Sequence, residues 1–172
     1  MKPTALLLLT ACAAFAQTPD LKTPSGYPKM VQKQVTGWIE QAARKMPEQE
    51  YAFQPDPAVR SFGQIVGHVA DSNYLFCSIV LGEKNPSPSV EKTTTTKTAL
   101  IAAVLESFTY CGRAYDTLTD ANINDTVKAF GQERNRLGAL WFNASHNLEH
   151  YGNLVVYLRI KGIVPPSSEP AR

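Results

Sequence analysis

Apolar residues recur three and four positions apart in four segments of this 172-residue chain, and that spacing places them on one side of an α-helix. The first segment covers residues 30–46 and ends before Pro47. The second covers residues 62–81. Ser61 and Gln64 have the form of a capping box, in which each side chain satisfies a free backbone N–H at a helix start. The pattern therefore predicts two helices in the first half of the chain.

The third segment covers residues 100–118, and the fourth covers residues 134–161. Gly162 is expected to cap the fourth helix, and the prolines that follow are expected to stop it. We expect the buried stripe of this helix to comprise Leu137, Trp141, Ala144, Leu148, Tyr151 and Val155. No useful length of the chain alternates with period two, so the connectors at residues 82–98 and 119–132 are predicted to be loops.

Four helices with one apolar stripe each predict an all-α fold, a four-helix bundle. The connector at residues 82–98 is unusually long for such a bundle. At a reach of up to about 3.3 Å per residue it can span the roughly 30 Å length of a twenty-residue helix. The third helix therefore need not run antiparallel to the second.

The composition suits one globular domain. Hydrophobic residues make up 44% of the chain and charged residues 19%, so there is enough apolar surface to form a core without help from a metal or a disulfide. The formal charge is +2, and the lysines and arginines are scattered along the sequence. A nucleic-acid-binding protein usually carries a basic stripe, so we expect neither DNA nor RNA as a partner.

The N-terminus has the features of a secretory signal peptide. Lys2 precedes an apolar run, and residues 14–16 have the small-x-small form of a cleavage site. We therefore expect a signal peptide at residues 1–16, a flexible lead-in at residues 17–29, the bundle at residues 30–166 and a short tail after it. The predicted location is periplasmic or extracellular. The apolar run is too short to span a bilayer, which takes about 20 residues.

A second processing route involves the cysteine in this segment. Residues 9–12 end in Cys12 and resemble a bacterial lipoprotein box, which would leave the protein lipid-anchored through that residue. Two cysteines follow, Cys77 and Cys111. In an exported protein they could pair as a disulfide, or they could remain two buried thiols. The sequence leaves both alternatives open.

Two of the three histidines, His146 and His150, lie four residues apart on the fourth predicted helix. This spacing brings their Cβ atoms to within about 6 Å, a separation at which two imidazoles can hold one ion. They lie nearly opposite the predicted apolar stripe, on a face shared with Ala139, Asn143, Asn153 and Tyr157. Between Leu137 and Leu158 the one charged residue is Glu149, so this face suits a cleft that admits a cation.

The third histidine, His68, lies on the second predicted helix. It falls inside the apolar arc of Ile65, Val69, Leu75 and Ile79, and therefore faces the other helices. Three imidazoles on two neighbouring helices predict a site for one divalent transition metal, with coordination positions left open for water or substrate. The alternative is that each histidine makes only ordinary hydrogen bonds.

Two acidic residues are candidates for a general base. Asp71 follows His68 by three positions and could orient a ligand ring, or it could be an exposed helix charge. Glu149 completes the H-x-x-E-H spacing of inverted zinc peptidases. That family needs a further acidic ligand well downstream, whereas the sole carboxylate side chain after His150 is Glu169 in the proline-rich tail. Membership of that peptidase family is therefore excluded.

Three stretches of the sequence resemble a DinB-like domain of the DinB/YfiT superfamily. They are residues 46–53 (MPEQEYAF), residues 60–71 (RSFGQIVGHVAD) and residues 143–159 (NASHNLEHYGNLVVYLR), the last followed by GIVPP. The resemblance implies a bundle with up-down-down-up connectivity and many dimeric members. It also implies a three-histidine site for zinc, nickel or a related ion such as iron or manganese, which falls on His68, His146 and His150.

The resemblance does not fix the reaction. DinB-like members with an assigned activity include thiol-dependent S-transferases and hydrolase-like proteins. The transferases use low-molecular-weight thiols that are abundant in the cytosol, whereas this chain is predicted to be exported. We therefore expect a metal-dependent hydrolase that acts on a small molecule. The alternatives are a non-catalytic metal-binding module and, less favoured because of export, a thiol-dependent S-transferase.

Overall fold

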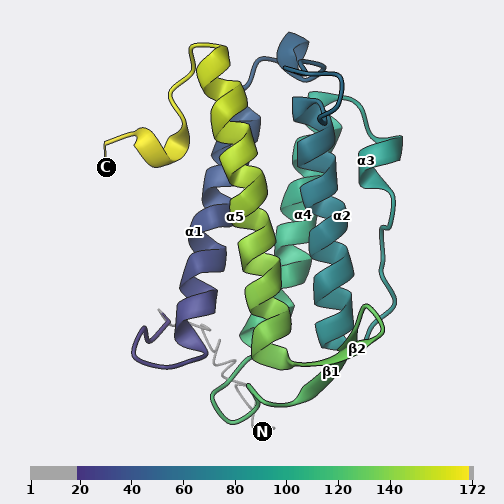
Figure 1. The fold of residues 1–172 in the computed structure, drawn as a ribbon, viewed down its shortest axis with the longest axis vertical. Coiled ribbons are helices and arrows are strands. Elements are labelled where there is room, and N and C mark those ends of the chain that lie inside the picture. Colours follow the sequence, from purple (N-terminus) through teal and green to yellow (C-terminus); the bar gives the residue numbers. More distant parts are fainter. Residues whose placement is uncertain (1–18, 171–172) are drawn as a thin grey trace, which may run out of the picture.

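Four long helices pack side by side in the computed structural model, which describes residues 19–170 (Figure 1). They are α1 (Gly26–Lys45), α2 (Phe62–Leu81), α4 (Lys97–Asp116) and α5 (Arg136–Ile160). The all-α four-helix bundle is therefore confirmed. The predicted signal peptide and Cys12 lie outside the described residues. Within residues 19–170, none of the helices is both long and apolar enough to cross a membrane.

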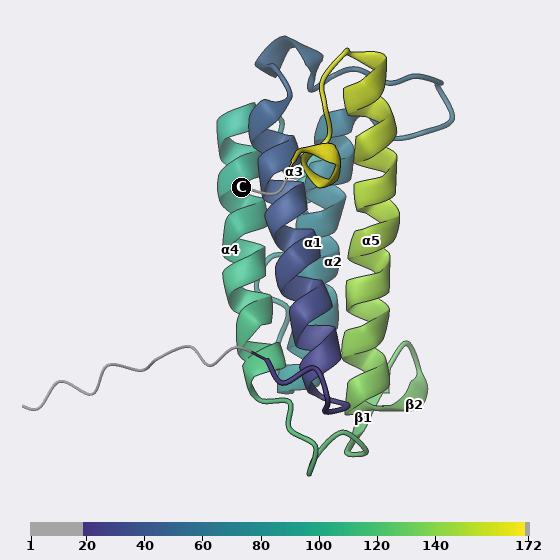
Figure 2. The same ribbon diagram turned by 90° about the vertical axis from the view of Figure 1, so that its left-hand side faces the viewer.

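The helices run up, down, down and up along the bundle axis (Figures 1 and 2). After α2, the chain returns along the outside of the bundle through the short helix α3 (Val90–Thr93) before α4 begins, so α2 and α4 run parallel. In the contacts between neighbours, α2 packs on α4 and α5, and α1 packs on α5 and α4. The long connector is thus what makes the down-down step possible.

The ends of α2 and α5 follow the local sequence. Ser61 accepts a hydrogen bond from the Gln64 backbone N–H at 3.2 Å, and Gln64 Oε1 accepts one from the Ser61 N–H at 2.8 Å, so the capping box is confirmed. Gly82 and Gly162 have φ angles of +68° and +72°, the left-handed conformation expected after a helix. Two 3₁₀ turns, η1 (Glu48–Glu50) and η2 (Pro166–Ser168), lie in the segments after α1 and α5.

Helix α1 begins at Gly26, four residues before the predicted start at Met30. Pro28 lies in the first turn of this helix, where a backbone N–H would have no partner within the helix, so proline is tolerated there. The part of the expected flexible lead-in that the structure describes is therefore turn and helix. Ser25 is anchored across the bundle, because its N–H donates to Asp120 Oδ1 at 2.9 Å.

The connector before α5 contains a hairpin that the sequence pattern did not predict. Strands β1 (Thr126–Ala129) and β2 (Gln132–Asn135) pair antiparallel, with Ala129 opposite Gln132. Phe130 and Gly131 form the two-residue turn with φ angles of +54° and +76°, as a tight hairpin requires. Each strand has only four residues, which is too few for a period-two pattern to stand out.

The predicted buried stripe of α5 is wrong in part. Trp141 and Leu148 are 38% and 40% exposed. The residues of α5 that the structure buries are Ala139, Leu140, Asn143, Ala144, Asn147, His150, Tyr151, Leu154, Tyr157 and Leu158. Asn143 and Asn147 are fully buried, and both donate from Nδ2 to Oδ1 of Asn73 on α2 at 3.0 Å. A search for apolar residues cannot find a stripe that contains paired amides.

The apolar core has two parts. The larger part lies around Ile39, Phe62 and Leu154, and the smaller lies around Leu118 and Leu140. In the smaller part, Cys77 of α2 and Cys111 of α4 form a disulfide with Cα atoms 5.1 Å apart. Of the two alternatives for these cysteines, the structure therefore has the disulfide, which links the two parallel helices.

Candidate metal centre

The structure brings the three predicted histidines together between α2 and α5. His68 Nε2 lies 3.3 Å from His146 Nε2, and His150 Nε2 lies 3.1 Å from the same atom. One ring nitrogen from each histidine falls within 4.8 Å of the others. His146 and His150 are one helical turn apart on α5, so they face the same way, and the packing of α2 on α5 supplies His68.

The environment of the site keeps the rings of His146 and His150 neutral. Burial lowers the pKa of His146 to about 4, and the neighbouring His68 adds to the effect. Burial also lowers the pKa of His150 to about 3, with further contributions from His146 and His68. A neutral imidazole has a lone pair on one ring nitrogen, which is the form that binds a metal. Both histidines of α5 are therefore available as metal ligands at neutral pH.

The outer ring nitrogens of the three histidines have different surroundings. His68 Nδ1 lies 3.1 Å from Oε2 of Glu91 on α3. The Asn153 amide lies 3.3 Å from His150 Nδ1. His146 Nδ1 is buried and has no hydrogen-bond partner among residues 19–170. Of the three rings, His68 is thus the one with a charged hydrogen-bond partner on its outer side.

Glu91 is the site residue that sequence reasoning missed. It lies 23 positions after His68, in a connector that was predicted to be a loop, and nothing in the local pattern indicates its role. A second oxygen of the same carboxylate, Oε1, accepts a hydrogen bond from Arg60 Nε at 2.8 Å. Glu91 therefore joins the histidine site to a cation at the start of α2.

The two acidic candidates lie at different distances from the histidine cluster. Asp71 contacts the backbone of α3, accepting hydrogen bonds from the N–H groups of Val90 at 2.6 Å and Glu91 at 3.0 Å. It is therefore neither an exposed helix charge nor a hydrogen-bond partner of a histidine ring. Glu149 is exposed and lines the cavity beside His150. Of the two, Glu149 is the one positioned to meet a small molecule in that cavity.

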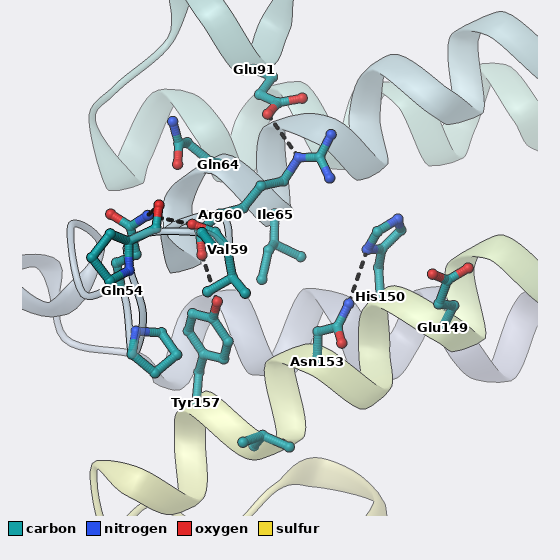
Figure 3. A pocket seen from close by; sticks show the side chains of 14 residues that line it. Gln54, Val59, Arg60, Gln64, Ile65, Glu91, Glu149, His150, Asn153 and Tyr157 are labelled. Carbon is teal, nitrogen blue, oxygen red and sulfur yellow. Dashed lines mark hydrogen bonds and ion pairs between the residues drawn. The ribbon is translucent and has the colours of Figure 1, made fainter.

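A cavity of about 820 Å³ opens beside His150, the one histidine among its lining residues (Figure 3). Its lining combines the connector before α2 with α2, α3 and one face of α5: Gln54, Pro55, Pro57, Ala58, Val59, Arg60, Gln64, Ile65, Glu91, Glu149, His150, Asn153, Val156 and Tyr157. Tyr157 fixes the connector by donating from its hydroxyl to the Arg60 carbonyl at 2.5 Å. The size and the mixed lining suit a small polar molecule.

Aromatic rings surround Phe76 on α2, next to His146. The Phe76 ring meets the His146 ring edge to face, with centroids 5.6 Å apart. Phe142 of α5 and Phe130 of the hairpin turn pack on Phe76 at 5.3 and 5.5 Å. The histidine site therefore has apolar neighbours as well as the polar cavity that His150 lines.

The donor set fits a divalent transition metal. Neutral imidazole nitrogens suit zinc, nickel, copper and iron, whereas magnesium and calcium prefer oxygen ligands. Three protein ligands would leave at least one coordination position open, as in catalytic rather than structural zinc sites. His146 Nδ1 is buried and has no hydrogen-bond partner among residues 19–170, so this ring has a nitrogen that a ligand could satisfy. The residues present therefore fit such an ion.

The sequence matches a family model and one curated protein. The family model described as the DinB superfamily matches residues 33–154. The uncharacterized protein YjoA of Bacillus subtilis (strain 168) is 28% identical to this chain over 123 residues, which cover 70% of this chain and 79% of YjoA. The matched segment includes α1 from residue 33 onward, all of α2 and α4, α5 up to Leu154, and all three histidines.

Solved structures agree in fold. A DinB-like protein from Bacillus cereus ATCC 10987 has a TM-score of 0.69 at 15% identity, covering 78% of this chain and 90% of that one. The crystal structure of YjoA gives 0.66 at 21% identity and covers 84% and 99%. A mycothiol-dependent maleylpyruvate isomerase gives 0.61 at 17% identity, with 80% and 68% covered. At these identities the likeness concerns the fold.

Proposed function

We propose that this protein, which belongs to the DinB superfamily, holds one divalent transition metal ion through His68, His146 and His150 and uses it to hydrolyse a small molecule. The observation that carries the proposal is the convergence of three ring nitrogens within 4.8 Å at a site where His150 also lines an open cavity. A purely structural site would have no need of such access.

The protein groups around the cavity suit this chemistry. Bound there, a divalent ion would act as a Lewis acid, which polarises a substrate oxygen or lowers the pKa of a coordinated water. Glu149 lines the same cavity and is exposed, so it is the candidate to accept a proton from water. Arg60 also lines the cavity, and its Nε is already bonded to Glu91, which fixes the direction of the guanidinium group.

Two other functions make different predictions. A non-catalytic metal-binding module would bind the same ion, but would turn over no substrate. The isomerase among the solved structures is described as mycothiol-dependent. An enzyme of that kind would need a low-molecular-weight thiol for activity. The open cavity favours an enzyme over a module, and it does not by itself choose between hydrolysis and thiol chemistry.

The test begins with metal analysis of the purified protein, where about one ion per chain is expected. Cobalt is then substituted, and small anions or chelating acids are added while the visible spectrum is recorded. An open coordination position predicts a shift in the spectrum. Turnover of ester, amide or phosphate substrates follows, with and without added thiol. If no added ligand changes the cobalt spectrum and no substrate is turned over, the non-catalytic module is favoured. If turnover requires added thiol, the thiol-dependent reaction is favoured.

We also propose that the protein is exported, with residues 1–16 as the signal peptide. The disulfide between Cys77 and Cys111 supports this, because disulfides persist in oxidising compartments and are rare in the cytosol. Fractionation of the cells that produce the protein, followed by mass spectrometry of the mature N-terminus, tests the proposal. A mature chain that starts near Gln17 is expected, a lipidated Cys12 would show the alternative route, and an uncleaved cytosolic chain would refute export.

A further inference from the structure

Helix α3 lies against α2 beside the histidine site, although it belongs to the long connector (Figure 1). It has four residues, Val90–Thr93, which is too short to be stable by itself. Val90 is 5% exposed and belongs to the larger part of the core. Contacts with α2 must therefore hold α3 in place, and two of these contacts come from residues that flank His68.

The first contact depends on Gly67. A Cβ atom at this position would lie 2.7 Å from Glu91 Cα, a separation that real Cβ atoms essentially never show, and 3.1 Å from Glu91 N, which is tighter than most Cβ contacts. Gly67 is in the interior of α2, where alanine would favour the helix more than glycine does. Glycine at this place is thus explained by the close approach of the α3 backbone to α2 immediately before His68.

The second contact is made by Asp71, one turn after Gly67. Its carboxylate accepts hydrogen bonds from the backbone N–H groups of Val90 at 2.6 Å and Glu91 at 3.0 Å. These are first-turn donors of α3 with no partner inside the helix, and Ser89 at the N-cap position makes no side-chain cap. Asp71 therefore caps α3 from outside and fixes the backbone of Glu91.

With its backbone held, Glu91 reaches two groups. Oε2 lies 3.1 Å from His68 Nδ1, and Oε1 accepts a hydrogen bond from Arg60 Nε at 2.8 Å. A carboxylate accepts hydrogen bonds, so His68 must carry its proton on Nδ1. The lone pair is then on Nε2, the atom that faces His146 Nε2 at 3.3 Å. Glu91 therefore selects the tautomer in which His68 can bind a metal from the side of the other two histidines.

We infer that α3 is a support for the metal centre and that Glu91 is its positioning residue, fixing the ring orientation and tautomer of His68. This inference rests on the proposed function, because it concerns a metal that the three histidines hold. Glu91 acts through His68 and is not a ligand itself, since it bonds the ring nitrogen opposite the one that faces the cluster. Outer partners of this kind usually change metal affinity about 10–100-fold.

The experiment measures the dissociation constant for Zn²⁺ by competition with a chelator, together with the visible spectrum of the Co²⁺-loaded full-length mature protein. Glu91→Ala should weaken Zn²⁺ binding about 10–100-fold and change the Co²⁺ spectrum. Glu91→Gln keeps an acceptor oxygen and should lose less. Glu106→Ala removes the same charge from an exposed position on α4, which contributes no residue to the cavity, and should bind like the wild type.

Gly67→Ala provides a second, independent route to the same loss. It removes no polar group, but its methyl would push the Glu91 backbone away from α2, so Zn²⁺ binding should weaken as in Glu91→Ala. If this variant does not fold, Asp71→Asn takes its place, because an amide in that position replaces one acceptor oxygen with a donor. Thermal unfolding of each metal-free variant shows whether folding is intact, and a purely structural role would lower stability without changing the Co²⁺ spectrum.

The possible outcomes distinguish a failure of the proposed metal site from a failure of the inference about Glu91. A wild-type protein that binds no metal would remove the proposed function, and this inference with it. A wild-type protein that binds Zn²⁺ tightly through His150, while Glu91→Ala binds equally well, would overturn the inference alone. Equal losses in Glu91→Ala and Glu106→Ala would also overturn it, since they would mean that the negative charge of the protein matters and the contact with His68 does not.

Discussion

Replacement of Asn73 by leucine tests whether buried amides join the two helices that carry the histidines. Asn73 is fully buried on α2. Its Oδ1 accepts hydrogen bonds from Nδ2 of both Asn143 and Asn147 on α5, each at 3.0 Å, and its own Nδ2 donates to the Val69 carbonyl at 2.8 Å. Leucine has the same branched skeleton of heavy atoms, is larger than asparagine and supplies no acceptor. Asn73→Leu therefore removes the acceptor of one N–H on each of these two buried amides, although Asn147 Nδ2 keeps its other hydrogen bond, to Gln32 Oε1 at 3.2 Å.

The size of the effect follows from those two donors. A buried polar group without a partner costs about 1–3 kcal/mol, so two of them cost about 2–6 kcal/mol. The leucine side chain offsets about 1–2 kcal/mol of this through its apolar surface. We therefore expect a net loss of about 1–4 kcal/mol in the free energy of unfolding, a large part of the roughly 5–15 kcal/mol typical of a domain.

The assay is urea unfolding of the metal-free protein, followed by circular dichroism, with Asn124→Leu as the control. Asn124 is exposed in the loop before β1, so that change should alter stability by less than about 0.5 kcal/mol. The double change Asn73→Leu with Asn143→Leu should restore part of the loss, because the second leucine removes one of the orphaned donors. A midpoint for Asn73→Leu equal to that of the wild type, at an unchanged slope, would refute the reasoning.

Three further predictions concern the site and the stability of the bundle. His150→Ala should lower metal occupancy sharply while the helical signal in circular dichroism stays nearly intact, because the apolar core folds without the ion. Replacement of both Cys77 and Cys111 by serine should lower the free energy of unfolding by about 2–4 kcal/mol, measured by urea titration under oxidising conditions. The metal-free protein should lose stability as the pH falls from about 6.5 towards 4, since the unfolded chain takes up protons on His146 and His150 that the folded chain, with pKa values of about 4 and 3, does not.

Each of these three predictions would be contradicted by a specific result. Unchanged metal content in His150→Ala would remove this residue from the ligand set, and collapse of the helical signal would make the site a structural one. Equal stability with and without the disulfide would mean that the bond does not restrict the unfolded chain. For the pH prediction, a variant with both histidines of α5 replaced by glutamine should lose this part of the acid sensitivity. If it loses as much stability as the wild type, other groups are responsible.

The sequence predicted the helices well because helical periodicity and capping are local properties. The box at Ser61 and Gln64 and the glycine at 162 have their effect within one turn of the chain, so their residue types are enough to recognise them. The pair His146 and His150 was recognised for the same reason, because residues four positions apart on a helix face the same side.

The predictions were wrong where the local sequence pattern carries no sign of the contacts that a residue makes in the folded protein. On α5 the amides Asn143 and Asn147 lie in the core because Asn73 accepts their hydrogen bonds, and exposed Trp141 and Leu148 had been assigned to the core instead. Strands of four residues were likewise too short for their pattern to be read. Only for the amides is the partner distant in the sequence, 70 and 74 positions away, whereas the two strands of the hairpin are neighbours along the chain.

By itself, therefore, the sequence determined the four helices, the identity of the three histidines and the family to which the chain belongs. Only the tertiary structure decided which residues contact the histidines. Glu91 reaches His68 because Gly67 allows α3 to approach and Asp71 holds its backbone. A connector has no periodic pattern of its own, and its conformation is set by the surface on which it packs. The surroundings of the histidines, including the cavity, are consequently a property of the packed bundle.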